Sequence, residues 1–126
     1  MVVLADDLIW STRLDAAISA AGAVPRAARR IADLERLLAP AAPEDATGAE
    51  AAAAARFAII DLTARAYDGL EAIRIATGTG ARVVAVGQHD DVALRRAALA
   101  AGAERVFTYR ALFENGPRTL GAWLGR

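Results

Sequence analysis

Three aspartates are the residues of this chain whose type and spacing could support chemistry. Asp6 and Asp7 follow an apolar run at 2–5, and Asp61 follows a second apolar run at 57–60. Carboxylates a few ångströms apart repel each other by about 1 kcal/mol or more at a protein surface. A divalent cation relieves that repulsion, and Mg²⁺ suits a few carboxylates with water and phosphate oxygens. The pattern favours one shared acidic site over separate, solvated turn residues.

The elements that must position these aspartates can be read from the hydrophobic pattern. Short apolar runs typical of strands covered on both faces recur at 2–5, 57–60, 83–86 and 105–108. A weaker candidate lies at 23–27, where Pro25 restricts it to a sheet edge. Helical spacing of apolar residues separates the runs, with the last helix predicted over about 110–124 and Gly22 and Gly102 as helix ends.

The alternation of strands and helices predicts an α/β fold. We expect a doubly wound, five-stranded parallel sheet of order 2-1-3-4-5, a flavodoxin-like three-layer sandwich. Ligands of such sheets bind beyond the carboxyl ends of the strands, where the strand order reverses. That point lies between the first and third strands, at the three aspartates. Residues 1–126 are predicted to form a single domain, with 39–56 as a surface excursion before the third strand.

Composition excludes several classes of function. The net charge is zero, which argues against nucleic-acid binding, and the absence of cysteine excludes disulfides, thiolate metal sites and cysteine catalysis. No apolar run reaches the roughly 18 residues that span a bilayer, and the N-terminus lacks the basic start of a signal peptide. We therefore expect a cytoplasmic location and no membrane partner. The glycines that a dinucleotide site needs after the first strand are missing.

With these residues in place, the chain resembles the receiver domain of response regulators in two-component signalling. The resemblance rests on the Asp6-Asp7 pair and on Asp61, which precedes Asp68-Gly69 by seven residues. The segments "GQHDD" (87–91) and "AALAAGAERVFTY" (97–109) extend it over essentially the whole chain. It implies that Asp61 accepts a phosphoryl group from a histidine kinase. It also implies that Mg²⁺ is held by Asp6, Asp7, Asp61 and the backbone of Thr63.

The sequence departs from the receiver pattern where phosphate would be sensed. Gly87 stands where receivers carry a hydroxyl, and Tyr109 stands where they carry a lysine, a residue absent from this chain. Val106 occupies the position of the switch aromatic, and Phe107 is one residue away. Arg65 replaces a proline, and either it reaches Asp61 as an ion-pair partner or it is exposed to solvent.

These departures favour an atypical, degenerate receiver, a signalling module rather than an enzyme. Phosphorylation of Asp61 is then weak, absent or uncoupled from a response. One alternative is a working phosphoacceptor with Mg²⁺, and another is a flavin or nucleotide binder that uses the same crevice. The expected partner is a histidine kinase, a downstream regulator or a second copy of the chain, at the surface of 91–124. Arginine and aromatic residues favoured at interfaces mark this surface: Arg95, Arg96, Phe107, Arg110, Phe113 and Trp123.

Overall fold

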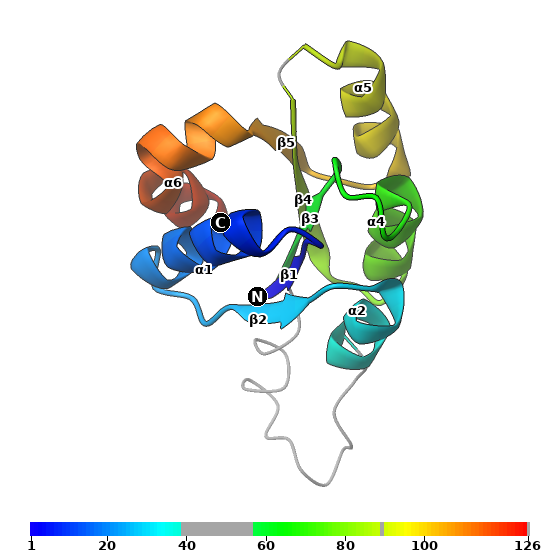
Figure 1. The fold of residues 1–126 in the computed structure, drawn as a ribbon, viewed down its shortest axis with the longest axis horizontal. Helices are drawn as coiled ribbons and strands as arrows, with labels where there is room; N and C mark the ends of the chain where they lie inside the picture. Colours follow the sequence, from blue (N-terminus) through cyan, green and yellow to red (C-terminus); the bar gives the residue numbers. More distant parts are fainter. Residues whose placement is uncertain (39–56, 89, 126) are drawn as a thin grey trace, which may run out of the picture.

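The predicted parallel sheet is present in the computed structural model, which describes residues 1–38, 57–88 and 90–125. The strands, all parallel, are β1 (Val2–Leu4), β2 (Arg26–Ala28), β3 (Phe57–Asp61), β4 (Arg82–Gly87) and β5 (Arg105–Thr108). Their order is β2-β1-β3-β4-β5, which confirms the predicted topology (Figure 1). The predicted excursion at 39–56 lies outside the described residues.

Helices cover both faces of the sheet. They are α1 (Leu8–Ala20), α2 (Ile31–Leu38), α4 (Gly69–Gly78), α5 (Val92–Ala101) and α6 (Tyr109–Leu124). Helices α1 and α6 lie on one side, and α2, α4 and α5 lie on the other (Figure 1). None of the helices in the described part of the chain is long and apolar enough to cross a membrane.

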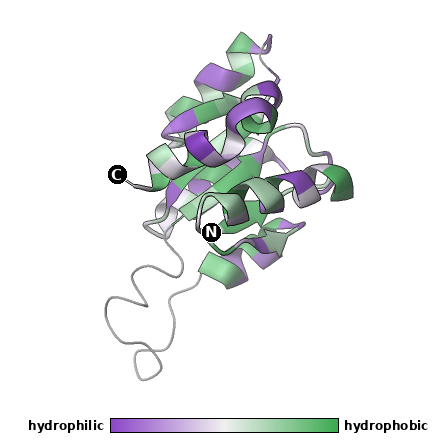
Figure 2. Cartoon of the chain, turned by 90° about the vertical axis from the view of Figure 1, so that its left-hand side faces the viewer, coloured by the Kyte–Doolittle hydropathy of each residue, from purple (hydrophilic) through white to green (hydrophobic). Residues whose placement is uncertain are grey.

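Successive residues along a strand pack in two separate hydrophobic clusters. Val2 and Leu4 pack in the cluster under α2, α4 and α5, whereas Val3 packs in the cluster under α1 and α6. This alternation follows from the period of two residues along a strand. The central strands are accordingly hydrophobic along most of their length (Figure 2). Burial on both faces explains why these strands read as unbroken apolar runs.

Proline and glycine residues account for where β2 begins, where α1 and α5 end and where α6 bends. Strand β2 lies at the sheet edge, as predicted, but it begins after Pro25 at Arg26 rather than spanning 23–27. Gly22 and Gly102 end helices with φ of 93° and 125°, a conformation that favours glycine. Helix α6 is kinked at Asn115, where φ is −143°, and Pro117 lies just beyond the kink. Proline lacks the N–H of a helical hydrogen bond and clashes with the preceding turn, so the break has a local cause.

Trp123 is buried in the core, and the prediction that it anchors a surface interface is wrong. Its side chain is only 2% exposed, and its ring meets Phe57 edge-on with centroids 5.3 Å apart. The Arg82 guanidinium lies 5.2 Å from the Trp123 ring centroid and pairs with Glu104 at 2.9 Å. The kinked C-terminal half of α6 therefore turns this indole toward the sheet rather than toward a partner.

Candidate functional site

Asp61 occupies the centre of the candidate site. It is the last residue of β3 and is 1% exposed. Its Oδ1 accepts hydrogen bonds from the Thr63 backbone N–H at 2.9 Å, from Thr63 Oγ1 at 2.8 Å and from the Tyr109 hydroxyl. A buried carboxylate is costly unless donors surround it, and these donors supply that compensation.

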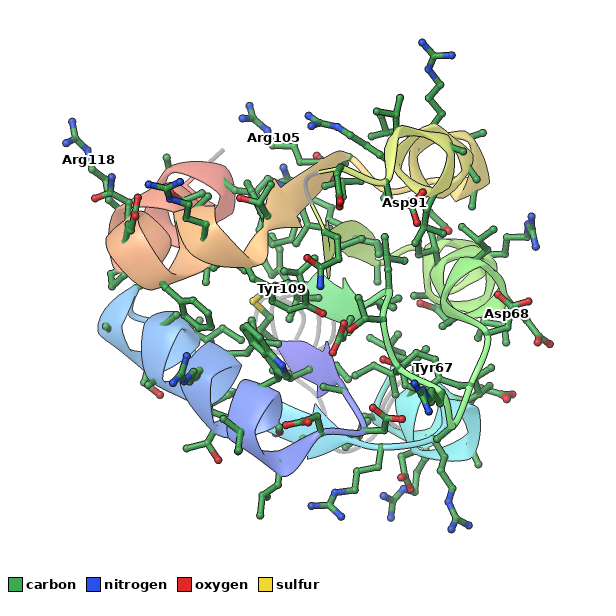
Figure 3. All side chains as sticks on the ribbon, turned by 45° about the horizontal axis from the view of Figure 1, so that its top comes forward. Tyr67, Asp68, Asp91, Arg105, Tyr109 and Arg118 are labelled. Atoms are coloured by element: carbon green, nitrogen blue, oxygen red, sulfur yellow. The ribbon has the colours of Figure 1, made fainter. Side chains whose placement is uncertain are left out.

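Tyr109 reaches Asp61 because β5 ends and α6 begins at the same point. Thr108 caps α6, with its Oγ1 accepting from the Ala111 N–H at 3.1 Å. Tyr109 is thus the first residue of the helix and is directed toward the strand ends (Figure 3). Its hydroxyl also lies 2.6 Å from Thr63 Oγ1. The position that the resemblance assigns to a lysine therefore carries a neutral donor to Asp61.

A second tyrosine binds the backbone of the same site. The Tyr67 hydroxyl lies 2.7 Å from the carbonyl oxygen of Asp61 and 2.9 Å from that of Leu4, which links the ends of β3 and β1. Burial, followed by the negative charges of Asp61 and Asp6, raises the pKa of Tyr67 above its usual value. Burial and the hydrogen bond to Asp61 likewise raise the pKa of Tyr109. Both phenols are therefore protonated donors at neutral pH.

The acidic pair, Asp6 and Asp7, accepts hydrogen bonds from backbone N–H groups. Asp6 Oδ2 accepts from the backbone N–H groups of Arg65 at 2.9 Å and Ala66 at 3.0 Å. Asp7 is the N-cap of α1, and its Oδ1 accepts from the backbone N–H groups of the first turn at 2.8 and 3.1 Å. Each carboxylate at this end of the sheet thus has its own protein partners.

The arrangement does not fit a divalent cation as it stands. Across residues 1–38, 57–88 and 90–125, no group of three or more His, Cys, Asp or Glu side chains is arranged to hold a metal. Asp61 offers Oδ1 to three protein donors rather than to a cation, and Asp6 and Asp7 are turned to separate backbone segments. The predicted Mg²⁺ site, including the backbone of Thr63, whose N–H contacts Asp61, remains a prediction.

The other predicted site positions are explained by their contacts. Arg65 is exposed and forms none of the ion pairs in the described part of the chain, so the partner of Asp61 in this structure is Tyr109. Gly87 is buried at the end of β4, where an added Cβ would lie 3.4 Å from the Leu62 side chain. Val106 and Phe107 are half-buried on opposite faces of β5.

An open cleft of about 360 Å³ lies beside Tyr109. The end of β4, the end of β5 and the start of α6 line it, with Gly87, Gln88, Thr108, Tyr109, Arg110, Phe113 and Glu114. Sequence reasoning identified Gly87 and Tyr109 but missed the side chains of Thr63 and Tyr67. A Thr two residues after an aspartate is a signal for a local side-chain turn, whereas no local pattern marks Tyr67.

The predicted interface residues other than Trp123 lie at or near the surface. Arg95 and Arg96 are exposed on α5, and Arg110 is exposed on α6, where it pairs with Glu114 at 3.0 Å. Phe113 is 43% exposed and stacks on Trp10 with ring centroids 4.7 Å apart. The face formed by α5, β5 and α6 thus combines charge with one exposed aromatic.

Comparisons with known proteins support the fold. No protein-family model and no curated protein matches the sequence. The structure is similar to the receiver domain of DrrB activated with BeF3, with a TM-score of 0.69, 16% identity and coverage of 99% of this chain and 92% of that chain. It is also similar to the beryllofluoride-activated NtrC4 receiver domain dimer, with a TM-score of 0.72, 16% identity and coverage of 98% and 94%.

A third similar structure is a response regulator from Burkholderia pseudomallei solved with a phosphorylated aspartic acid, a calcium ion and citrate. Its TM-score is 0.67, its identity is 16%, and the match covers 97% of this chain and 70% of that chain. At these identities the similarities show that the chain has the receiver-domain fold.

Proposed function

We propose that residues 1–126 form an atypical receiver domain that acts in signal transduction through protein–protein contacts. Phosphorylation of Asp61 is weak, absent or uncoupled from a response. The observation that carries this proposal is the environment of Asp61, which is buried with its Oδ1 bonded to Thr63 and Tyr109. The proposed location of this function is the cytoplasm.

Phosphoryl transfer to Asp61 would require one of its oxygens to approach phosphorus in line with the departing group. A new bond from the carboxylate oxygen to phosphorus would form as the bond from phosphorus to the donor breaks. Asp61 Oδ1, which already accepts several hydrogen bonds, is the poorer nucleophile of the two carboxylate oxygens, because its lone pairs are occupied. The neutral Tyr109 hydroxyl also supplies no positive charge for the transferred phosphoryl group.

The proposed partner surface is the face of α5, β5 and α6. A histidine kinase, a downstream regulator or a second copy of the chain would contact Arg95, Arg96 and Arg110, with Phe107 and Phe113 as the apolar residues. The similarity to a dimeric receiver domain supports the second-copy form of this proposal. Such contacts do not require phosphorylation of Asp61.

A working phosphoacceptor is the second candidate. The position of Asp61 at the carboxyl end of β3 favours it, as does the phosphorylated aspartic acid in the similar Burkholderia protein. Mg²⁺ would then have to bind after the side chains around Asp61 rearrange.

Intact-mass measurement after incubation with Mg²⁺ and a small acyl-phosphate donor separates the two candidates. We expect no gain, or a gain well below one phosphoryl group per chain, because Asp61 is buried and hydrogen-bonded. The Asp61→Asn variant, which keeps the size of the side chain, is the matched control. A gain of one phosphoryl group that disappears in Asp61→Asn would establish the phosphoacceptor instead.

A further inference from the structure

Helix α5 has the fewest buried residues of the helices in the described part of the chain. Only Ala98 is buried in α5, whereas α1 has four buried residues and α6 has five. Figure 1 shows α5 at one corner of the molecule, beside α4 and next to the edge strand β5. It packs on the core through Leu94, Ala98 and Ala101, and most of its other residues are exposed.

Four exposed residues of α5 form a surface that we call the α5 stripe: Val92, Arg95, Arg96 and Leu99. Each arginine lies three or four residues from both Val92 and Leu99, a spacing that makes side chains neighbours on a helix. Val92 is 54% exposed and Leu99 is 43% exposed. The stripe therefore presents two aliphatic side chains to water, with two guanidinium groups between them.

The arginines of the α5 stripe have no carboxylate partner within residues 1–38, 57–88 and 90–125, where all the ion pairs lie elsewhere. Helix α5 itself contains no acidic residue, and Asp91 before it caps its first turn. Arg105 at the start of β5 is also exposed and is directed away from the sheet (Figure 3). Because the whole chain has zero net charge, this excess of positive charge is local to the α5 side.

We propose that the α5 stripe is the docking site for an acidic amphipathic helix of another protein. The inference rests on the proposed function and deepens it, because it states the chemistry of the partner. Val92 and Leu99 are seven residues apart, about 10 Å along the helix axis at 1.5 Å per residue. Aliphatic side chains at the same spacing on a partner helix match them. Carboxylates beside those side chains complement Arg95 and Arg96.

The stripe favours this partner over two others. A second copy docked through the same stripe would place the arginines against their own copies, and like charges at an interface repel each other. A nucleic acid would attract the arginines through its phosphates but would offer no aliphatic side chains to cover Val92 and Leu99. A partner that combines aliphatic with acidic side chains suits all four residues of the stripe.

Fluorescence anisotropy with labelled synthetic peptides tests the proposal on the full chain. The probe is an acidic helical peptide of about 20 residues, with leucines seven residues apart and glutamates beside them. A second peptide has lysine in place of each glutamate, and a third has the composition of the first in scrambled order. We expect saturable binding of the acidic peptide that weakens as the salt concentration rises. Binding of the scrambled peptide should be about tenfold weaker, and the lysine peptide should not bind.

The double variant Arg95→Gln, Arg96→Gln should bind the acidic peptide about tenfold more weakly, since each exposed ion pair changes an equilibrium constant by roughly two- to fivefold. The matched control is Arg29→Gln, Arg30→Gln, which removes another adjacent pair of exposed arginines, after β2 at the opposite edge of the sheet. The control should keep the affinity of the unmodified chain. Leu99→Ala, which keeps helix propensity, should also weaken binding, an effect that attraction between charges alone does not produce.

The proposal fails if the acidic peptide does not bind, or if it binds the Arg95→Gln, Arg96→Gln variant as tightly as the control variant. Tighter binding of a single-stranded oligonucleotide than of the acidic peptide would assign the stripe to nucleic acid. A dimer in analytical ultracentrifugation that the same double variant abolishes would assign the stripe to a second copy. Either assignment overturns the proposal. Circular dichroism confirms that each variant is folded, and Leu99→Ala alone decides if the double variant is not.

The outcome is distinguishable from failure of the proposed function. Stoichiometric phosphorylation of the unmodified chain would reject the atypical receiver, whatever the acidic peptide does. A chain that takes up no phosphoryl group and does not bind the acidic peptide would reject the docking site alone.

Discussion

Two tyrosines, the only ones in the chain, bind the same aspartate at different atoms. Tyr109 donates to the carboxylate of Asp61, whereas the Tyr67 hydroxyl contacts its main-chain carbonyl. Unpaired burial of either group would cost free energy, so both hydroxyls contribute to stability. Tyr67 and Tyr109, which contact Asp61, therefore also hold β1, β3 and α6 together.

Tyr67→Phe should lower the free energy of unfolding by about 1 kcal/mol at neutral pH, through loss of one hydrogen bond. It should also flatten the loss of stability at alkaline pH. Burial, and then the charges of Asp61 and Asp6, raise the pKa of Tyr67 in the folded state. The unfolded chain thus loses its phenol proton first, at about pH 10, and stability falls as the pH rises further.

Urea unfolding between pH 7 and 11 measures this effect. The unmodified chain should lose stability above about pH 10 more steeply than Tyr67→Phe does. The variant should keep part of the loss, because the pKa of Tyr109 is also raised. Parallel curves for the two proteins would contradict the assignment of the alkaline loss to Tyr67.

At the residue scale, the sequence identified the carboxylates at the ends of β1 and β3 but not their contacts. Asp6, Asp7 and Asp61 could be identified because each follows an apolar strand. The partner of Asp61 could not, because Tyr109 lies 48 positions away and its approach depends on where β5 ends. Arg65 was the nearer candidate along the chain, yet its backbone N–H binds Asp6 while its side chain faces solvent.

At the scale of single elements, Gly102 is the clearest test of how a helix end is built. Gly102 ends α5 with φ of 125°, and an added Cβ would lie 2.8 Å from Thr77 on α4. Gly22 ends α1 with φ of 93° but has no atom within 4 Å of such a Cβ. The two glycines share a positive φ that is strained for other residues, and they differ in crowding.

We expect Gly102→Ala to cost more stability than Gly22→Ala. A left-handed alanine costs roughly 1–2 kcal/mol, and the contact with Thr77 adds to this at position 102 only. Gly121→Ala, inside α6 with open space around it, should instead gain about 0.5–1 kcal/mol of helix propensity. Chemical denaturation measures all three. Equal losses at 102 and 22 would mean that Thr77 moves aside at little cost.

The elements themselves were largely predictable, since the apolar runs at 57–60 and 105–108 became β3 and β5 within one residue. Pro25 correctly marked the edge strand, because proline cannot serve as a ladder donor. The kink in α6 was missed, although Pro117 was a visible signal. Trp123 was assigned to the interface because aromatic residues are favoured there, whereas the structure buries it in the core.

At the scale of the whole molecule, two hydrophobic clusters share one sheet. Leu34 on α2 and Leu120 on α6 are both fully buried, on opposite faces. Successive residues of a strand pack in different clusters, as Val3 and Leu4 do. The same strands therefore contribute side chains to both layers. Loss of either helix layer would leave the same strands exposed to water. The faces are therefore expected to unfold together.

Leu34→Ala and Leu120→Ala test this coupling. Each should lower the free energy of unfolding by about 2–5 kcal/mol, because each leaves a cavity in a closely packed layer. If the sheet couples the layers, both variants should unfold in one transition, with a lower midpoint and an unchanged denaturant slope. Circular dichroism in urea follows the helices of both layers, and the fluorescence of the two tryptophans, Trp10 and Trp123, follows the layer of Leu120 alone. Separate midpoints for the two signals in either variant would show that the layers unfold independently.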